Sequence, residues 1–195
     1  MTAYEAAETA AQLLKKNTTE PHLALEAVVE PQLQALKSKE DYVAFLKRFY
    51  GCFKPVESLI EKNIDATVLP DIAQRRKAER IVHDLTFSNT HIEPLPVATQ
   101  LPQIGNAIEA FGALYVLEGS TLGGRGITRM LLKNEALQLQ LAEVTFFSGY
   151  GEQTGVMWTS FLNSLNQFTT TPTAIQQQIA TANNTFTFFK IWLQQ

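Results

Sequence analysis

Apolar residues recur along most of this chain at intervals of three and four positions, which is the spacing of one face of an α-helix. The first segment with this spacing has its apolar face at Ala6, Ala10, Leu13 and Leu14. We expect its helix to continue, with a bend at Pro21, as far as Pro31. Pro31 predicts the start of another short helix, since proline is well suited to a first helical turn.

A second amphipathic segment covers residues 38–63. Ser38 is expected to cap its N-terminus, with Asp41 three residues further on. Pro55 predicts a bend within this helix. The buried face that we expect consists of Tyr42, Phe45, Leu46, Phe49 and Phe53.

The middle of the chain predicts helices separated by one clear loop. A helix is expected over residues 70–87, followed by a proline-rich loop over residues 88–102. The longest helical pattern comes next, from about residue 104 to about residue 132. Residues 146–151, FFSGYG, predict a turn or a short irregular link.

Two final helices are expected over residues 153–168 and 172–195, joined by a threonine connector that supplies an N-cap. No segment alternates with the period of a β-strand, and the sequence contains no internal repeat. The pattern therefore predicts an all-α bundle of about seven or eight helices, in a single domain over residues 1–195. Bundles of this kind build ligand and metal sites between facing helices.

Composition and charge disfavour several classes of protein. The 195 residues are 45% hydrophobic and carry a formal net charge of −3, without the basic stripe of a nucleic-acid-binding protein. No apolar run approaches the ~20 residues of a membrane span, and the first residues lack the apolar core of a signal peptide. The single cysteine, Cys52, excludes an internal disulfide and a thiolate metal cluster, so we expect a cytoplasmic protein. The densest basic segment is interpreted as a solvated helix face and comprises Arg75, Arg76, Lys77 and Arg80.

Four glycines interrupt the longest helical pattern, in LEGSTLGGRG at residues 117–126. A glycine inside a helix costs roughly 1 kcal/mol relative to alanine, so their presence needs a reason. One interpretation is structural: Gly119, Gly123 and Gly124 let another helix approach closely. The other is functional: a kinked helix without side chains lies flat against a planar ligand. A phosphate-binding glycine loop does not fit, because no strand precedes the segment.

The chain has three histidines as candidate metal ligands. His91 falls in the proline-rich loop and is interpreted as a surface residue. His83 lies one helical turn after Glu79, and a surface pair is a better interpretation of these two residues than a metal site. His22 lies one turn before Glu26, and a carboxylate beside an imidazole fixes its tautomer and raises its basicity as a metal ligand. Taken alone, His22 also suits a structural histidine.

Together, the His22 segment and the glycine segment resemble the heme oxygenase family. The family's proximal helix carries a pattern close to L-K-x-x-T-x-x-x-H-x-x-x-E, which is matched by Leu14, Lys15, Thr18, His22 and Glu26. Its distal helix carries a G-x-x-x-G-G core, which is matched by Gly119, Gly123 and Gly124. The stretch LYVLEGSTLGG, with the later FFSGYG and TFTFFKIWL, is most similar to the bacterial biliverdin-producing enzymes associated with bacteriophytochromes.

The resemblance implies a fold in which heme lies between the proximal and distal helices. His22 would bind the heme iron, Glu26 would support His22, and Lys15 would pair with a heme propionate. The distal segment would contact heme and leave room for O2, and its expected catalytic residues are Gly119, Ser120, Gly123 and Gly124.

The activity that the resemblance implies is cleavage of heme, which is both substrate and cofactor, to biliverdin, carbon monoxide and ferrous iron. This reaction uses O2 and electrons from a ferredoxin- or flavoprotein-type donor protein. A bilin-binding phytochrome is an implied partner that takes the product. Neither nucleic acid nor a membrane is an expected partner.

Two departures from the family pattern concern the site. Animal enzymes have an aspartate after the first distal glycine, where this chain has Ser120, which can hold a water molecule but supplies no negative charge. They also have a lysine and an arginine for the propionates, where this chain has Gly155 and Thr159. The alternative cations in this chain are Arg125, Arg129 and Lys190.

Other functions of the same fold stay open. The departures at Ser120, Gly155 and Thr159 favour a heme-binding or heme-trafficking protein that does not turn heme over. A di-iron relative is disfavoured because it needs repeated E-x-x-H patterns. A thiaminase-like relative would need Cys52 as its nucleophile, but the aromatic neighbours in FYGCFK indicate a small packing residue.

Overall fold

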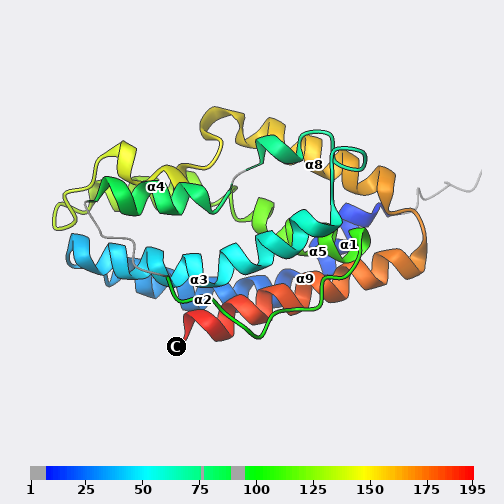
Figure 1. Cartoon of the computed structure of the whole chain (residues 1–195), viewed down its shortest axis with the longest axis horizontal. Coiled ribbons are helices and arrows are strands. Elements are labelled where there is room, and N and C mark those ends of the chain that lie inside the picture. The colour runs from blue at the N-terminus through cyan, green and yellow to red at the C-terminus, as the bar shows by residue number, and fades with distance from the viewer. Residues whose placement is uncertain (1–7, 76, 89–94) are drawn as a thin grey trace, which may run out of the picture.

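The computed structural model of the chain describes residues 8–75, 77–88 and 95–195 (Figure 1). The longer helices are α1 (Ala10–Asn17), α2 (Thr19–Gln34), α3 (Lys39–Asn63), α4 (Glu79–Phe87), α5 (Ala107–Gly119), α6 (Gly124–Lys133), α8 (Thr154–Phe168) and α9 (Pro172–Leu193). The short ones are η1 (Ile72–Gln74), η2 (Leu141–Glu143), α7 (Thr145–Ser148) and η3 (Gly151–Gln153). These described residues contain no β-strand, so the predicted all-α fold is confirmed.

The helices form two layers with α5 between them (Figure 1). In one layer lie α2, α3 and α9, and both α2 and α3 contact α9. The other layer contains α4 and α8. Because α5 packs against α3 and α9 on one side and against α8 on the other, it joins the layers, and most of its residues are buried.

Side-chain caps begin the helices where the sequence signals are strongest. The side chain of Ser38 accepts a hydrogen bond from the backbone N–H of Asp41, and that of Thr171 accepts one from Ala174, which confirms both predicted caps. Asn106 caps α5 in the same way. These side chains satisfy N–H groups that the first helical turn leaves without a partner.

The opening helix kinks where a proline removes a hydrogen bond. Pro21 has no N–H to donate to the carbonyl of Asn17, and α1 and α2 are separated at Thr18. The predicted bend is therefore present, about one turn before the proline. The predicted helix start at Pro31 is wrong, because α2 runs through Pro31 to Gln34. Pro31 is exposed, so water can satisfy the carbonyl one turn earlier that has lost its donor.

The helix predicted over residues 70–87 is interrupted in the middle. After η1, Arg75 is extended, with φ −68° and ψ 151°, and α4 begins only at Glu79. Arg75 is 3% exposed, so the interpretation of the basic segment as a solvated helix face is wrong for this residue. The chain leaves the helical conformation here because Arg75 bonds to groups inside the molecule.

The other residues of the basic segment are also engaged. Lys77 is partly buried and pairs with Glu61, and Arg80 is partly buried and donates to the carbonyl oxygen of Gly149 at 2.6 Å. Arg76 lies outside the described residues. The predicted solvated face is therefore not found at the three basic positions that the structure describes.

The longest predicted helix is in fact two helices, α5 and α6, separated by residues 120–123. Gly124 is the first residue of α6. A Cβ at this position would lie 2.1 Å from the carbonyl oxygen of Phe147, so a larger residue would collide with that backbone. A Cβ on Gly112 would lie 2.4 Å from the carbonyl oxygen of Gln178, so α5 and α9 approach each other closely there. The structural interpretation of the glycine cluster is thus correct for Gly124, since only glycine permits such an approach.

An aromatic cluster fills the space between α3 and α7. Its residues are Phe45, Phe49, Phe53, Phe146 and Phe147, with ring centroids 5.1–6.2 Å apart. The predicted face of α3 is buried as expected, with Phe49 only partly so. Gly149, with φ +55°, forms the predicted turn after α7. Cys52 is fully buried beside this cluster.

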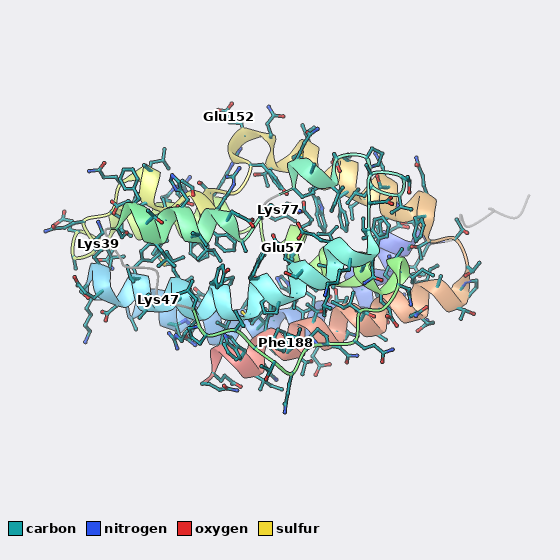
Figure 2. The ribbon with its side chains drawn as sticks, viewed as in Figure 1. Lys39, Lys47, Glu57, Lys77, Glu152 and Phe188 are labelled. Atoms are coloured by element: carbon teal, nitrogen blue, oxygen red, sulfur yellow. The ribbon has the colours of Figure 1, made fainter. Side chains whose placement is uncertain are left out.

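Charged side chains lie both outside and inside the molecule (Figure 2). Glu152 projects from the outer edge before α8, whereas Glu57 lies between the layers. Glu57 accepts hydrogen bonds from Lys54 Nζ at 2.8 Å and from the backbone N–H of Ala78 at 2.9 Å. Burial nevertheless raises the pKa of Glu57. Within the described residues, no helix is both long and apolar enough to span a membrane.

Candidate functional site

His22 lies in the first part of α2, with its side chain half exposed. Its Nε2 is 3.3 Å from Oε1 of Glu26, so the predicted pairing of these two residues is present. The imidazole ring also packs against Phe186 of α9, with 5.5 Å between ring centroids. One edge of the ring is thus held by a carboxylate, while part of it stays open to a ligand.

The His22 segment and the glycine segment meet through Thr18 and Tyr115. Burial raises the pKa of the Tyr115 hydroxyl, and the side chain of Thr18, which lies nearby, lowers it. Thr18 is one helical turn before His22, and Tyr115 is one turn before Gly119. Two motifs almost one hundred residues apart in the sequence are therefore joined at one point of the fold.

The glycines of the cluster differ in what surrounds them. Gly123 has no atom within 4 Å of the place where a Cβ would lie. At Gly119 a Cβ would lie 3.7 Å from the ring of Trp158, which is an ordinary contact. Neither residue is required for close helix packing, in contrast to Gly124. The break between α5 and α6 thus has open space at Gly123, whereas Thr121 within it is buried.

Ser120 follows Gly119 and is exposed. Its hydroxyl donates a hydrogen bond to the carbonyl oxygen of Leu117 at 2.7 Å. A hydroxyl that donates in this way still has oxygen lone pairs with which it can accept. Ser120 therefore presents an acceptor at the α5–α6 turn.

The candidate cations are spread over three helices. Lys15 is exposed on α1 and forms no ion pair with another described residue. Arg125, on α6, is exposed and donates to the carbonyl oxygen of Gly151 at 3.3 Å. Arg129 is exposed on α6 and Lys190 is partly buried on α9, and neither is ion-paired with another described residue. The partners of these four side chains therefore do not indicate which of them would bind an anionic group of a ligand.

Gly155 and Thr159 are both exposed on the outer face of α8. They line an open concavity of about 700 Å³, together with Glu152, Val156, Ser160, Asn163, Ser164 and Gln167. Lysine and arginine are absent from these lining residues, and the only charged one is acidic. The concavity contains none of the residues predicted to bind a ligand.

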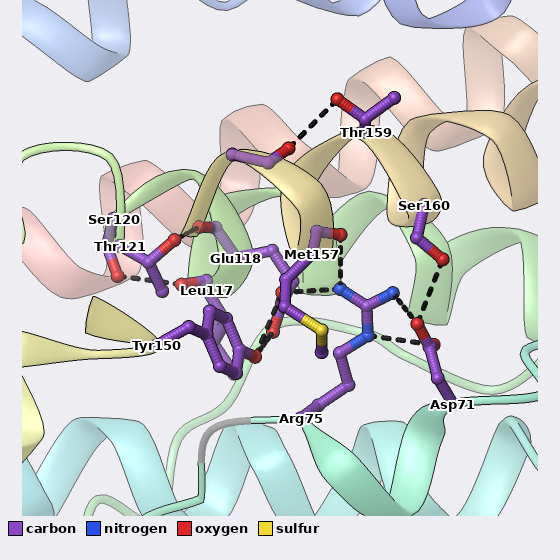
Figure 3. A network of polar contacts seen from close by, with 11 residues as sticks. Asp71, Arg75, Leu117, Glu118, Ser120, Thr121, Tyr150, Met157, Thr159 and Ser160 are labelled. Carbon is purple, nitrogen blue, oxygen red and sulfur yellow. Dashed lines mark hydrogen bonds and ion pairs between the residues drawn. The ribbon is translucent and has the colours of Figure 1, made fainter. Parts of the chain in front are cut away.

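A buried charge that the sequence reasoning missed lies directly behind the glycine turn (Figure 3). Glu118 is 2% exposed and precedes Gly119. Its carboxylate accepts hydrogen bonds from Arg75 Nη1 at 2.9 Å and from the hydroxyl of Tyr150 at 2.8 Å. A glutamate inside the apolar run FGALYVLEG was the available signal, because a buried carboxylate needs a partner.

His83 belongs to no metal site among the described residues. His83 Nδ1 lies 3.3 Å from Oδ1 of Asp84, and Glu79 pairs with Lys54 instead, so the predicted pairing of His83 with Glu79 is wrong. His91 lies outside the described residues. Nowhere in the described part of the chain do three histidine, cysteine or acidic residues gather as metal ligands. Because His22 offers only one imidazole, it suits a metal ion that is already bound within a larger ligand.

Known proteins of the same architecture share this arrangement of helices. The family model described as heme oxygenase matches residues 8–195. The structure of the NO- and CO-bound heme oxygenase from Neisseria meningitidis is 25% identical to this chain, with a TM-score of 0.75, and the match covers 96% of this chain and 92% of that one. A heme oxygenase from Leptospira interrogans has the same fold at 18% identity and a TM-score of 0.76, over 95% of this chain and 98% of that one. No curated protein matches the chain.

Proposed function

Because the chain belongs to the heme oxygenase family, we propose that it cleaves heme to biliverdin, carbon monoxide and ferrous iron. The reaction uses O2 and electrons from a ferredoxin- or flavoprotein-type donor. The observation that supports this proposal is the proximity of Thr18 to Tyr115. The half-exposed His22 follows Thr18 by one helical turn, and Gly119 follows Tyr115 by one turn.

The surroundings of His22 fit a heme group. Phe186 supplies an apolar surface beside the imidazole. Asn183 lies on the same face of α9, about one turn earlier, and its buried Oδ1 has no hydrogen-bond partner among the described residues. Gly123 leaves open space at the α5–α6 turn. An apolar wall, an unpaired acceptor and a turn with open space at Gly123 suit a flat apolar ring that carries a polar ligand.

The residues that would hold heme are His22, Glu26 and Lys15. His22 would bind the iron through a ring nitrogen, since its ring is half exposed. Glu26 would accept a hydrogen bond from the other nitrogen, fixing the tautomer and raising the basicity of the imidazole. Lys15 would pair with a propionate, since it has no ion-pair partner among the described residues.

Gly119, Ser120 and Gly123 would form the opposite wall, with Gly124 packed behind them against the backbone of Phe147. Heme itself supplies the iron chemistry with O2, so the protein's task is to hold and orient the ring and to manage water and protons. The missing side chains at Gly119 and Gly123 would leave room above the ring. Ser120 would hold an ordered water molecule through its hydroxyl oxygen, in place of an aspartate.

The resemblance of LYVLEGSTLGG to bacteriophytochrome-associated enzymes supports a phytochrome that receives the biliverdin. The same resemblance supports action in the cytoplasm, as a single domain over residues 1–195. Which cation completes the propionate site among Arg125, Arg129 and Lys190 is decided by heme-binding measurements on their alanine variants.

A heme titration of wild type, His22→Ala and His83→Ala tests the proposal. Wild type and the His83→Ala control should give the same Soret band, and His22→Ala should lose it. Reduction in air with a ferredoxin-type donor should then convert the Soret band into the spectrum of biliverdin. A Soret band that does not depend on His22 would contradict the assigned ligand.

A heme carrier without turnover is the second candidate function. The absence of a cation at Gly155 and Thr159, and among the other residues that line the α8 concavity, favours it. The same titration separates the two candidates. A His22-dependent Soret band that persists during reduction, with more than one donor tried, supports the carrier and contradicts the oxygenase.

A further inference from the structure

One buried arginine bonds to three separate segments around the α5–α6 turn (Figure 3). Nε and Nη2 of Arg75 donate to the carboxylate of Asp71, at 2.9 and 2.5 Å. Nη1 donates to Oε2 of Glu118 on α5 at 2.9 Å and to the carbonyl oxygen of Met157 on α8 at 2.8 Å. The Arg75 side chain is 1% exposed, so these bonds are made away from water, where their loss is most costly.

The two partners of Nη1 directly precede two residues that pack together. Glu118 is followed by Gly119, and Met157 is followed by Trp158. A Cβ on Gly119 would lie 3.7 Å from the Trp158 ring, and this ring also lies 5.4 Å from that of Tyr115. A single guanidinium group therefore holds the two backbone segments that bring Trp158 against Gly119.

We propose that Arg75 is a positioning residue that fixes how closely Trp158 packs on Gly119, and so how much of the α5–α6 turn is open to a ligand. The packing of Trp158 on Gly119 is a property of the protein without a ligand. The effect of this packing on heme binding rests on the proposed function.

The positive charge of Arg75 does not by itself explain why an arginine is needed at this position. Burial lowers the pKa of its guanidinium, but the hydrogen bond to Asp71 and the charge of Glu118 outweigh burial and raise that pKa above its ordinary value. A lysine would keep the charge but has one nitrogen and no planar fork, so it would not bond to all three segments. Arg75→Lys thus removes the bridge between α5 and α8 and keeps the charge.

Tyr150 offers a control within the same network. Its hydroxyl donates to both carboxylate oxygens of Glu118, at 2.8 and 3.1 Å. This hydrogen bond holds Glu118 without joining it to α8. Tyr150→Phe therefore weakens the hold on Glu118 and leaves the Arg75 bridge in place.

The test measures the environment of Trp158 in the ligand-free protein. The chain has two tryptophans, so Trp192→Phe leaves Trp158 as the only one. In that background, acrylamide quenching of tryptophan fluorescence, far below the unfolding temperature, reports how accessible Trp158 is. Arg75→Lys should raise the quenching constant about twofold, because loss of the bridge favours local opening.

Two control variants make the result specific. Tyr150→Phe should leave the quenching constant unchanged, and so should Arg48→Lys, which makes the same chemical change at an exposed position of α3. An Arg75→Lys protein that melts earlier with an unchanged quenching constant would show a purely structural role and overturn the proposal. An equal rise in Tyr150→Phe would also overturn it.

If Arg75→Lys does not fold, Glu118→Gln replaces it in the same measurement. This variant keeps the size of the side chain and loses the ion pair with Arg75. A rise in the quenching constant supports the proposal, and an unchanged constant contradicts it.

A second readout uses heme transfer from the loaded protein to apomyoglobin. Loss of the bridge should speed heme release from Arg75→Lys on the order of tenfold, the effect of losing about one charge-assisted hydrogen bond. If no variant binds heme, the proposed function fails, and the fluorescence measurement still decides the role of Arg75. If heme binds through His22 but Trp158 is unaffected, only the role of Arg75 fails.

Discussion

The side chain of Thr18, at the α1–α2 junction, lies near the hydroxyl of Tyr115 on α5. Burial raises the pKa of Tyr115, and the nearby Thr18 side chain offsets part of that rise. Thr18 is itself buried and donates to the carbonyl oxygen of Leu14 at 2.8 Å. The contact is therefore a polar link in a largely apolar interior.

Removing this link should destabilise the fold. Tyr115→Phe is expected to lower the free energy of unfolding by about 0.5 kcal/mol, the low end of the net value of one hydrogen bond, because this polar contact is looser than a formed hydrogen bond. Urea denaturation measures the change. Tyr50→Phe is the matched control, because Tyr50 is also partly buried on a helix and its hydroxyl has no such polar contact with another described residue. Equal stabilities of the two variants would count against the link.

Neighbouring glycines should respond to alanine in opposite ways. Gly124→Ala is expected to destabilise the protein by about 2 kcal/mol or more, because its Cβ would collide with the backbone of Phe147. Gly123 has φ −77° and ψ −14°, which alanine adopts readily, and open space around it. Gly123→Ala should therefore stabilise the protein by about 0.5 kcal/mol. Chemical denaturation of the pair checks both signs, and a loss of stability in both variants would refute the distinction.

The thiol of Cys52 should be unreactive in the folded protein. It is fully buried, and burial raises its pKa well above the ordinary value. A thiol reagent such as DTNB should label Cys52 only after unfolding in urea, at pH 8. Thr173→Cys, at an exposed position of α9, should react at once at the new thiol. Rapid labelling of wild type would reopen the idea of a nucleophilic cysteine.

Stability should fall at acid pH through Glu143. Burial by itself would raise the pKa of Glu143, but hydrogen bonds from Lys39 and from the backbone of Gln140 outweigh burial and hold the pKa below its ordinary value of 4.5. A carboxyl with a lowered pKa stabilises the folded state above pH 4.5, and this contribution is lost as the pH falls through the folded-state pKa.

Glu143→Gln should therefore differ most from wild type near neutral pH and least in strong acid. Unfolding free energies measured between pH 7 and pH 3 give the two curves. Glu135→Gln, at an exposed residue, should run parallel to wild type throughout. Parallel curves for Glu143→Gln would mean that the ion pair contributes nothing.

Local signals predicted the parts of the fold that depend on neighbours in sequence. The caps at Ser38 and Thr171 are correct because the capping side chain bonds within its own first turn. The buried face of α3 is correct because its spacing alone decides which side chains point inward. The pairing of His22 with Glu26 also follows from helix geometry.

Long-range contacts explain what was mispredicted. Arg75 leaves a helical pattern to reach Glu118, which is distant in sequence, and no local signal indicates such a partner. Gly124 packs against the backbone of Phe147, whereas Gly123, with the same chemistry, faces open space. Sequence spacing does not distinguish these two glycines, because they differ only in whether the Phe147 segment packs against them.

The kink at Thr18 places Lys15 and His22 on two helices that both contact α9, while α1 also contacts α8. The backbone N–H of Ala11, on α1, donates to Asn166 of α8, and Gln32, on α2, donates to the carbonyl oxygen of Leu193 of α9. The spacing between the cation and the imidazole is therefore not set by the rise of one rigid helix. It also depends on how α8 and α9 hold α1, so a small shift of α8 against α9 would change the distance between the two side chains.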